Sequence, residues 1–209
     1  MDGSGGSHRI TDEATLVALY GEPGPAALTK EVDYLHPHYR SMIAASPFVA
    51  MATSGPGGLD VSPRGDPAGF VAIEDDRTLL IPDRRGNNRL DSLRNLIADP
   101  RIALLFLIPG VGETLRVNGR AEISVDPALL ARFPMQGKLP RSVIVVHVER
   151  VYFQCQKALV RSELWNPAKH IDCMALPSTG TILADISRGV AGGEQYDREY
   201  PERMKATIY

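Results

Sequence analysis

The spacing of short β-type segments is the strongest constraint on the fold of this chain. From Phe48 to Phe153, apolar and β-branched runs follow one another, and turn residues separate most of them. Parallel strands need a crossover of a dozen or more residues between them, usually a helix, and these runs lie too close together for that. The pattern therefore predicts a mainly β domain with flanking helices (α+β), built as a closed or split antiparallel β-barrel.

Three local signals refine the predicted strands. Gly55-Pro56-Gly57-Gly58 predicts a hairpin turn rather than a dinucleotide-binding loop, because a strand pattern follows it and the G-x-G-x-x-G spacing is absent. The run IALLFLI at 102–108 lacks alternation and predicts a strand buried on both faces. Asn118-Gly119 predicts a β-bulge or a sharp coil in its strand. The expected strands cover residues 48–54, 59–63, 70–73, 78–81, 102–108, 114–124 and 143–153.

A basic turn lies between a predicted strand and a predicted helix. Pro82 is expected to end the strand, because proline has no amide hydrogen for a ladder. Leu90, Leu93 and Ile97 then recur at helical spacing, and Asp99-Pro100 predicts the end of the helix. The segment 82–90 therefore leads directly into the amino end of a helix.

The composition of this turn favours an anion site. Arg84, Arg85 and Arg89 lie within six residues, and Asn87 and Asn88 are potential helix caps. Free amides at a helix N-terminus attract anions, and each guanidinium can bind two oxygens. A solvated basic turn is the alternative interpretation. The density of arginines beside a helix start favours the anion site.

Charge and hydropathy exclude some functional classes. The 209 residues are 44% hydrophobic, which is enough for one substantial core. With 23 basic and 25 acidic side chains the net charge is −2, so nothing attracts the whole chain to nucleic acid or to an anionic membrane. No apolar run approaches the roughly 20 residues of a membrane helix, and the start lacks the apolar core of a signal peptide. A cytoplasmic location is expected.

The remaining patterns suggest three regions. We expect a helical extension over residues 1–46 with a flexible Gly/Ser-rich start, a barrel over 47–165, and a segment over 166–209 that packs on the barrel. Residues 154–165 have helical spacing that would place Lys157, Arg161 and Trp165 on one face. Cys155 and Cys173 are expected to be free, buried thiols, although a fold that brought them together would allow a disulfide.

Several motifs in order resemble those of a known family. SPRGD at 62–66, IPDRRGNNRLDSLRNL at 81–96 and ETLRVNGRAEI at 113–123 appear in this order, with the apolar run 102–108 between the last two. This arrangement resembles the pyridoxamine 5'-phosphate oxidase-like family of FMN-binding split barrels, in a branch of probable FMN-dependent enzymes. The resemblance covers residues 34–165 and, more weakly, the C-terminal tail.

The resemblance implies a homodimer with two FMN sites at its interface. It implies that Ser62, Pro63 and Arg64 lie along the flavin and ribityl chain, and that Pro82 and Asp83 lie near the ring. The residues that it implies at the phosphate are Arg84, Arg85, Asn87, Asn88 and Arg89. Arg116 takes the place where the oxidases have glutamine. Together with Lys157 and Arg161, it is a candidate for a cross-chain contribution.

The implied function is an FMN-dependent oxidoreductase with an unknown small-molecule substrate. FMN itself supplies the redox chemistry, so no catalytic side chain is assigned. The single tryptophan, Trp165, does not match the tryptophan-rich segment of the vitamin B6 oxidases, so that substrate is not predicted. No metal site is expected, since His36-Pro37-His38 has no cluster of further ligands beside it.

Two alternatives come from other classes. A non-catalytic flavin-binding or haem-binding carrier or sensor is one, with His147 as the candidate haem ligand. The other is a nucleic-acid binder that uses the arginines of 84–94, but the near-neutral charge and 6% aromatic content argue against it.

Overall fold

The computed structural model describes residues 8–209, which divide into two compact units. The Gly/Ser-rich start falls mostly on residues 1–7, outside the described range. The smaller unit ends at Glu31 and contains two helices, α1 (Glu13–Tyr20) and α2 (Pro25–Thr29). The larger unit, Val32–Tyr209, holds the sheet and all later helices of the described chain. The domain boundaries expected at residues 46 and 165 stay predictions.

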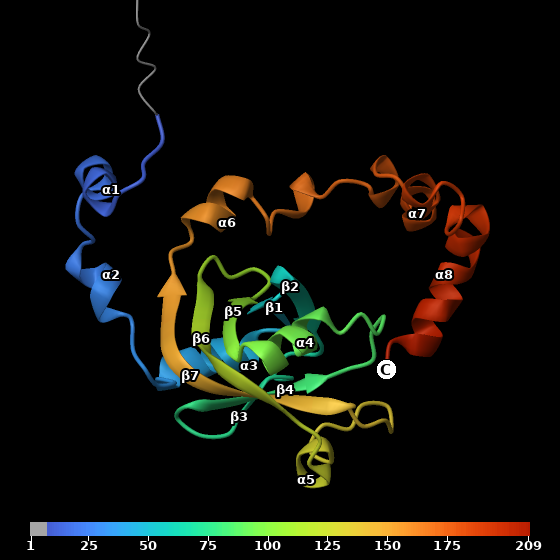
Figure 1. Ribbon diagram of the computed structural model, residues 1–209, viewed down its shortest axis with the longest axis horizontal. Helices are drawn as coiled ribbons and strands as arrows, with labels where there is room; N and C mark the ends of the chain where they lie inside the picture. Colours follow the sequence, from blue (N-terminus) through green and yellow to red (C-terminus); the bar gives the residue numbers. More distant parts are fainter. Residues whose placement is uncertain (1–7) are drawn as a thin grey trace, which may run out of the picture. The chain divides into compact units, whose positions relative to one another are not determined.

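The larger unit is organised around one strongly curved sheet (Figure 1). All of its neighbouring strands pair antiparallel, in the order β2-β1-β5-β6-β7-β4-β3. The strands are β1 (Phe48–Gly55), β2 (Gly58–Gly65), β3 (Ala72–Ile73), β4 (Thr78–Asp83), β5 (Arg101–Leu107), β6 (Thr114–Ser124) and β7 (Ser142–Gln154). The predicted split antiparallel barrel with flanking helices is confirmed, as is the hairpin turn at Gly55–Gly58.

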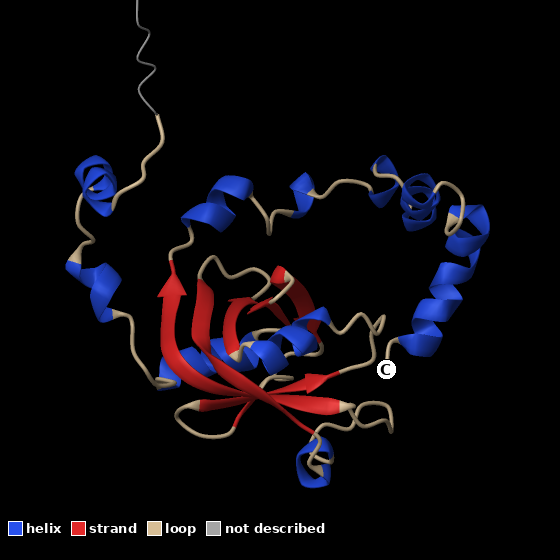
Figure 2. Ribbon diagram, in the orientation of Figure 1, coloured by secondary structure: helices blue, strands red, loops and turns tan. Residues whose placement is uncertain are grey.

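Two helices lie within the curve of the sheet (Figure 2). They are α3 (Pro37–Ala45), which buries Tyr39 and Ile43, and α4 (Asp91–Ala98), which buries Ser92 and Leu96. No described helix is long and apolar enough to cross a membrane. The other helical segments are α5 (Pro127–Leu130), α6 (Lys157–Ser162), η1 (Pro167–Lys169), η2 (Cys173–Ala175), α7 (Thr179–Ser187) and α8 (Gly193–Thr207).

Strand β5 is buried on one face only, so the expectation of burial on both faces is wrong. Ile102, Leu104 and Phe106 are at most 4% exposed and belong to the core. The alternate residues Leu105 and Leu107 are only half-buried. The reason is that α3 and α4 fill the concave side of the sheet, while the other side of β5 faces outward.

Helix α6 is shorter than expected and does not include Trp165. It ends at Ser162, because Glu163 adopts a left-handed conformation with φ of 49° that stops the helix. The expected shared face of Lys157, Arg161 and Trp165 is therefore wrong. The Trp165 indole instead donates a hydrogen bond to the Val111 carbonyl at 2.8 Å, which ties this segment to the loop between β5 and β6.

The two cysteines, Cys155 and Cys173, are free, as expected. Both are exposed, so the expectation that they are buried is wrong.

The predicted bulge at Asn118-Gly119 is confirmed, but its extra residue, Glu149, lies on the paired strand β7. The register between β6 and β7 shifts between Asn118 and Gly119, where the backbones approach closely. A Cβ atom added to Gly119 would lie 2.1 Å from the carbonyl oxygen of His147. Only glycine fits there without moving one of the two strands.

Replacing Gly119 by alanine should therefore destabilise the protein. Because the added carbon would meet backbone rather than a flexible side chain, we expect a loss of about 3 kcal/mol in the free energy of unfolding, measured by urea denaturation. Gly57→Ala is the matched control, since nothing lies within 4 Å of its added Cβ. Its stability should change by less than about 0.5 kcal/mol. Equal midpoints for the two variants would contradict the close approach.

Candidate functional site

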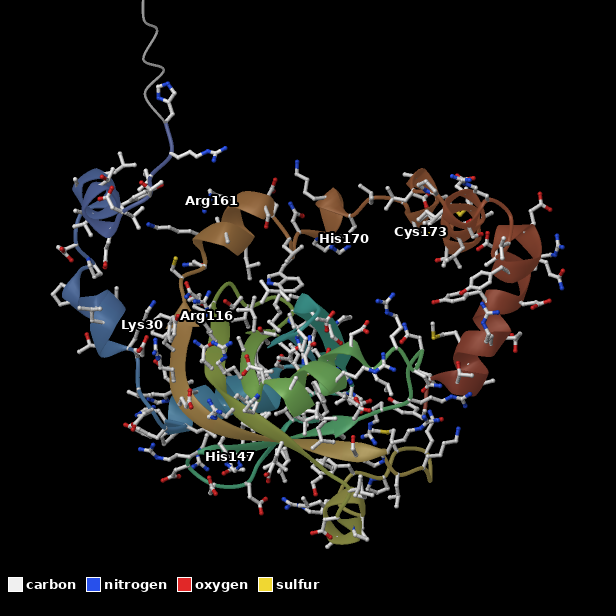
Figure 3. All side chains as sticks on the ribbon, viewed as in Figure 1. Lys30, Arg116, His147, Arg161, His170 and Cys173 are labelled. Carbon is white, nitrogen blue, oxygen red and sulfur yellow. The ribbon has the colours of Figure 1, made fainter. Side chains whose placement is uncertain are left out.

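A cavity of about 770 Å³ opens where β2, β4 and the start of α4 meet. Ten of the thirteen residues predicted from the sequence line it: Ser62, Pro63, Arg64, Pro82, Asp83, Arg84, Arg85, Asn87, Asn88 and Arg89. The other three, Arg116, Lys157 and Arg161, lie outside its lining, and Figure 3 places Arg116 on the sheet and Arg161 on α6. That any of these residues binds a cofactor stays a prediction.

Pro82 does not end its strand, contrary to the sequence expectation. It lies within β4 and is in register with Val143 of β7. On the other side of β4, β3 reaches only Leu79 and Leu80, so Pro82 lies at an open edge, where proline is tolerated. The strand can therefore continue to Asp83 and carry its carboxylate to the cavity wall.

The two asparagines of the basic turn do not cap α4, so that prediction is wrong. Asn88 is left-handed with φ of 60°, a conformation asparagine tolerates, and its side-chain oxygen accepts a hydrogen bond from Arg141 at 3.2 Å. Asn87 accepts from the Arg89 amide at 3.1 Å. Leu90 holds the N-cap position with φ of 62° and makes no side-chain cap. The first-turn amides of α4 therefore have no side-chain cap beside the cavity.

Two crossed ion pairs join the end of β2 to the end of β4. Arg64 on β2 donates to Asp83 on β4, and Arg84, just after β4, donates through Nε to Asp66, just after β2, at 2.7 Å. The four side chains are 19%, 10%, 17% and 1% exposed in that order. β2 and β4 are not neighbours in the sheet, so these pairs bridge its open side beneath the cavity.

Asp66 also holds a residue from the far end of the described chain. The Tyr209 hydroxyl donates to Asp66 at 2.6 Å, and the Arg84 guanidinium lies 5.9 Å from the Tyr209 ring centre. The hydrogen bond to Asp66 raises the pKa of the Tyr209 phenol, so the phenol keeps its proton and remains a donor. Lys138 donates to the Tyr209 backbone oxygen at 2.8 Å. Tyr209 thereby forms part of the cavity wall.

The arginines around the cavity differ in their partners. Arg64, Arg84 and Arg89 each pair with an aspartate. The hydrogen bond to Asp91 raises the pKa of Arg89, which is charged in any case. Arg85 has no hydrogen bond or ion pair with any described residue, and the side chain of Arg141 contacts the neutral amide of Asn88. Arg85 and Arg141 are therefore the cations on this wall that no carboxylate neutralises.

One buried donor at the cavity is unsatisfied. The Nε of Arg64 is buried and has no hydrogen-bond partner among the described residues. Leaving such a donor unpaired costs roughly 1–3 kcal/mol, more for a charged group, so a native protein rarely keeps one without a reason. Arg64 lines the cavity, and a ligand that carries an acceptor atom there would satisfy this nitrogen.

Sequence reasoning missed four contributors to the site. Asp66 belongs to the motif SPRGD but was not singled out, although a carboxylate two residues from Arg64 is a visible signal. Asp60 accepts a hydrogen bond from Ser92 at 2.6 Å across the cavity edge. Arg141 and Tyr209 come from distant segments, and no local pattern marks either of them.

The sequence matches one family profile over more than half of its length. The profile is described as Pyridoxamine 5'-phosphate oxidase, and the match covers residues 35–155. The matched region contains the sheet, α3, α4 and all of the ten cavity residues predicted from the sequence. No protein of curated function matches the chain.

Solved structures with related folds are only distantly similar in sequence. HupZ from Group A Streptococcus is 18% identical with a TM-score of 0.47, covering 57% of this chain and 94% of its own. A putative pyridoxamine 5'-phosphate oxidase from Lactobacillus delbrueckii is 18% identical with a TM-score of 0.45, covering 58% and 95%. The protein Atu2129 of unknown function from Agrobacterium tumefaciens is 22% identical with a TM-score of 0.40, covering 54% and 53%.

The crossed pairs generate a stability prediction. Asp66→Ala would leave the largely buried Arg84 without its carboxylate, so unfolding should become easier by about 3 kcal/mol. The control is Asp99→Ala, because Asp99 pairs with Arg101, whose side chain is 70% exposed, and such surface pairs contribute at most about 1 kcal/mol. Urea denaturation of both variants measures the difference. A loss for Asp66→Ala no larger than that of the control would contradict a structural role for the pair.

Proposed function

Because the chain belongs to the pyridoxamine 5'-phosphate oxidase family, we propose that it binds FMN in the cavity between β2, β4 and α4 and acts as an FMN-dependent oxidoreductase. The observation that carries this proposal is the cavity wall formed by the basic turn and Arg141. On this wall, Arg85 and Arg141 have no carboxylate partner among the described residues. A phosphate is the ligand group that such a wall favours beside uncapped helix amides. The cavity volume of about 770 Å³ is within the range of small-molecule sites.

The residues of the site divide into two roles in this proposal. Arg85, Arg89 and Arg141, with the first amides of α4, would hold the phosphate. Arg64, whose buried Nε lacks a partner, would donate to an acceptor on the rest of the cofactor. Arg84 is bound to Asp66 and to the Phe133 carbonyl, so its main role is to maintain the wall. This differs from the sequence expectation, which placed Arg84 directly at the phosphate.

The chemistry of the proposed reaction comes from the cofactor. FMN, when bound, supplies electron transfer, whereas the protein supplies binding, orientation and charge. Among the described residues, no group of three or more His, Cys, Asp or Glu side chains could hold a metal ion. The visible spectrum of the purified protein separates bound flavin from the haem-binding alternative, and reduction followed by a screen of electron acceptors separates an enzyme from a carrier.

The outward face of β2, β1 and β5 supports the proposed homodimer. Paired residues along these strands form two apolar rows on the side of the sheet away from the core, and the second row continues to Arg116 on β6. Arg116 would then face the second chain, as the cross-chain role requires. β2 is also an edge strand with unpaired backbone groups. The first row is Val61, Ala52 and Ala103. The second row is Pro63, Ala50 and Leu105, and Arg116 follows it on β6.

Removing a cation from the proposed phosphate site should weaken FMN binding. Arg85→Ala deletes a charged donor, so we expect the dissociation constant for FMN to rise about 10- to 100-fold, which corresponds to roughly 1.5–3 kcal/mol. Titration of FMN into the apoprotein, followed by flavin fluorescence, measures this. Arg101→Ala is the control, because Arg101 is exposed and does not line the cavity.

Riboflavin makes this experiment specific for the phosphate. Riboflavin lacks that group, so the wild type should bind it at least about tenfold more weakly than FMN, and Arg85→Ala should change riboflavin affinity little. If Arg85→Ala weakened both ligands equally, the turn would not be the phosphate site. A wild-type protein that bound no FMN would refute the proposed function itself.

The proposed dimer interface predicts the effect of a charge on the outward face. Val61→Asp should convert the dimer to a monomer, because burying an unpaired carboxylate in an apolar interface is strongly unfavourable. Val125→Asp is a matched control, since Val125 is 68% exposed, compared with 67% for Val61, and lies on another part of the chain. Sedimentation equilibrium over a wide concentration range measures the mass. A wild-type monomer that holds stoichiometric FMN would contradict the dimeric site.

A further inference from the structure

The buried pair between Arg64 and Asp83 is asymmetric in its use of donors. Arg64 donates through Nη1 to Asp83, and its Nε has no partner among the described residues. In the second crossed pair both of these donors are occupied. Nε of Arg84 donates to Asp66, and its Nη1 donates to the Phe133 carbonyl. Arg84 is thus fixed from both sides, whereas Arg64 is held at one end and keeps a buried donor available.

Asp83 is placed so that it fixes the orientation of Arg64. It is the last residue of β4, its backbone oxygen accepts from the Arg141 amide at 3.2 Å, and its side chain is 10% exposed. The strand therefore fixes the backbone position from which the carboxylate reaches Arg64. Both residues line the cavity, so the position of the Asp83 carboxylate determines where the free Nε of Arg64 can lie.

Asp83 also determines the charge near the ligand. With the carboxylate present, the positive charge of Arg64 is largely neutralised. Without it, a guanidinium in a partly buried site would be uncompensated, and its field would act strongly on any nearby group that gains negative charge. Reduction of FMN by two electrons and one proton adds one negative charge to the cofactor.

We propose that Asp83 is a positioning residue that holds Arg64 toward the cofactor and, by neutralising it, keeps the reduction potential of the bound FMN low. This inference rests on the proposed function. No other described cation in the cavity combines a buried, unpaired donor with a buried carboxylate partner.

The test is the midpoint potential of FMN bound to variant proteins, measured by dithionite titration against a reference dye. Asp83→Asn removes the neutralising charge, so reduced FMN should bind about tenfold tighter relative to oxidised FMN, a positive shift of about 30 mV for a two-electron couple. Arg64→Gln should shift the potential in the negative direction. The double variant should return close to the wild-type value, because the two changes share one interaction.

Controls separate positioning from a purely structural role. Asp83→Glu keeps the charge and should keep the wild-type potential. Asp99→Asn, the same substitution in a surface pair, should also have no effect. The melting temperature of each variant reports the fold, and if Asp83→Asn does not fold, the double variant and Arg64→Gln still decide the question.

The results that would overturn the inference are distinct from those that would refute FMN binding. If the wild type binds FMN and Asp83→Asn and Arg64→Gln leave its potential unchanged, while only their melting temperatures fall, the pair serves the fold alone and the inference is wrong. If the spectrum of the wild type shows no bound FMN, the proposed function fails first, before any variant is measured.

Discussion

The crossed ion pairs between the ends of β2 and β4 are the interaction on which the site depends. These strands lie near opposite ends of the sheet order, and a curved sheet of this kind leaves an opening between them. Arg64 with Asp83 and Arg84 with Asp66 bridge this opening with largely buried charges. Burying a charge is costly unless it is paired, so each residue requires its partner, and together they define the geometry of the cavity wall.

The same arrangement explains why a cluster of arginines can serve two purposes. Where a carboxylate is present, as for Arg84, the guanidinium is committed to the fold. Where none is present, as for Arg85, its charge is available to a ligand. The left-handed residues Asn88 and Leu90 turn the chain sharply between these arginines and α4, and they leave the start of α4 without a side-chain cap. The turn therefore presents cations and helix amides to one cavity.

The curvature of the sheet also gives its two faces different roles. The concave face is filled by α3 and α4 and forms the core, with Phe106 and Leu104 among its fully buried residues. The outward face of β1, β2 and β5 carries a second apolar surface, which suits association with another chain. The apolar run 102–108 thus has two hydrophobic faces, of which one packs in the core and the other is available to the proposed second chain.

The sequence alone determined the strands and, through the family resemblance of its motifs, most of the residues that line the cavity. Strand spacing, the Gly55–Gly58 turn and the bulge at Asn118-Gly119 follow from local backbone preferences, which act within a few residues. The resemblance of the motifs 62–66 and 81–96 to those of a known family implied ten residues that line the cavity, and local composition independently indicated the arginines of the basic turn. Only the tertiary structure decided that Arg84 pairs with Asp66, that Tyr209 reaches the cavity, and that β5 is buried on one face. These depend on contacts between distant segments, up to 143 residues apart for Tyr209 and Asp66, and local sequence patterns carry no information about such pairings.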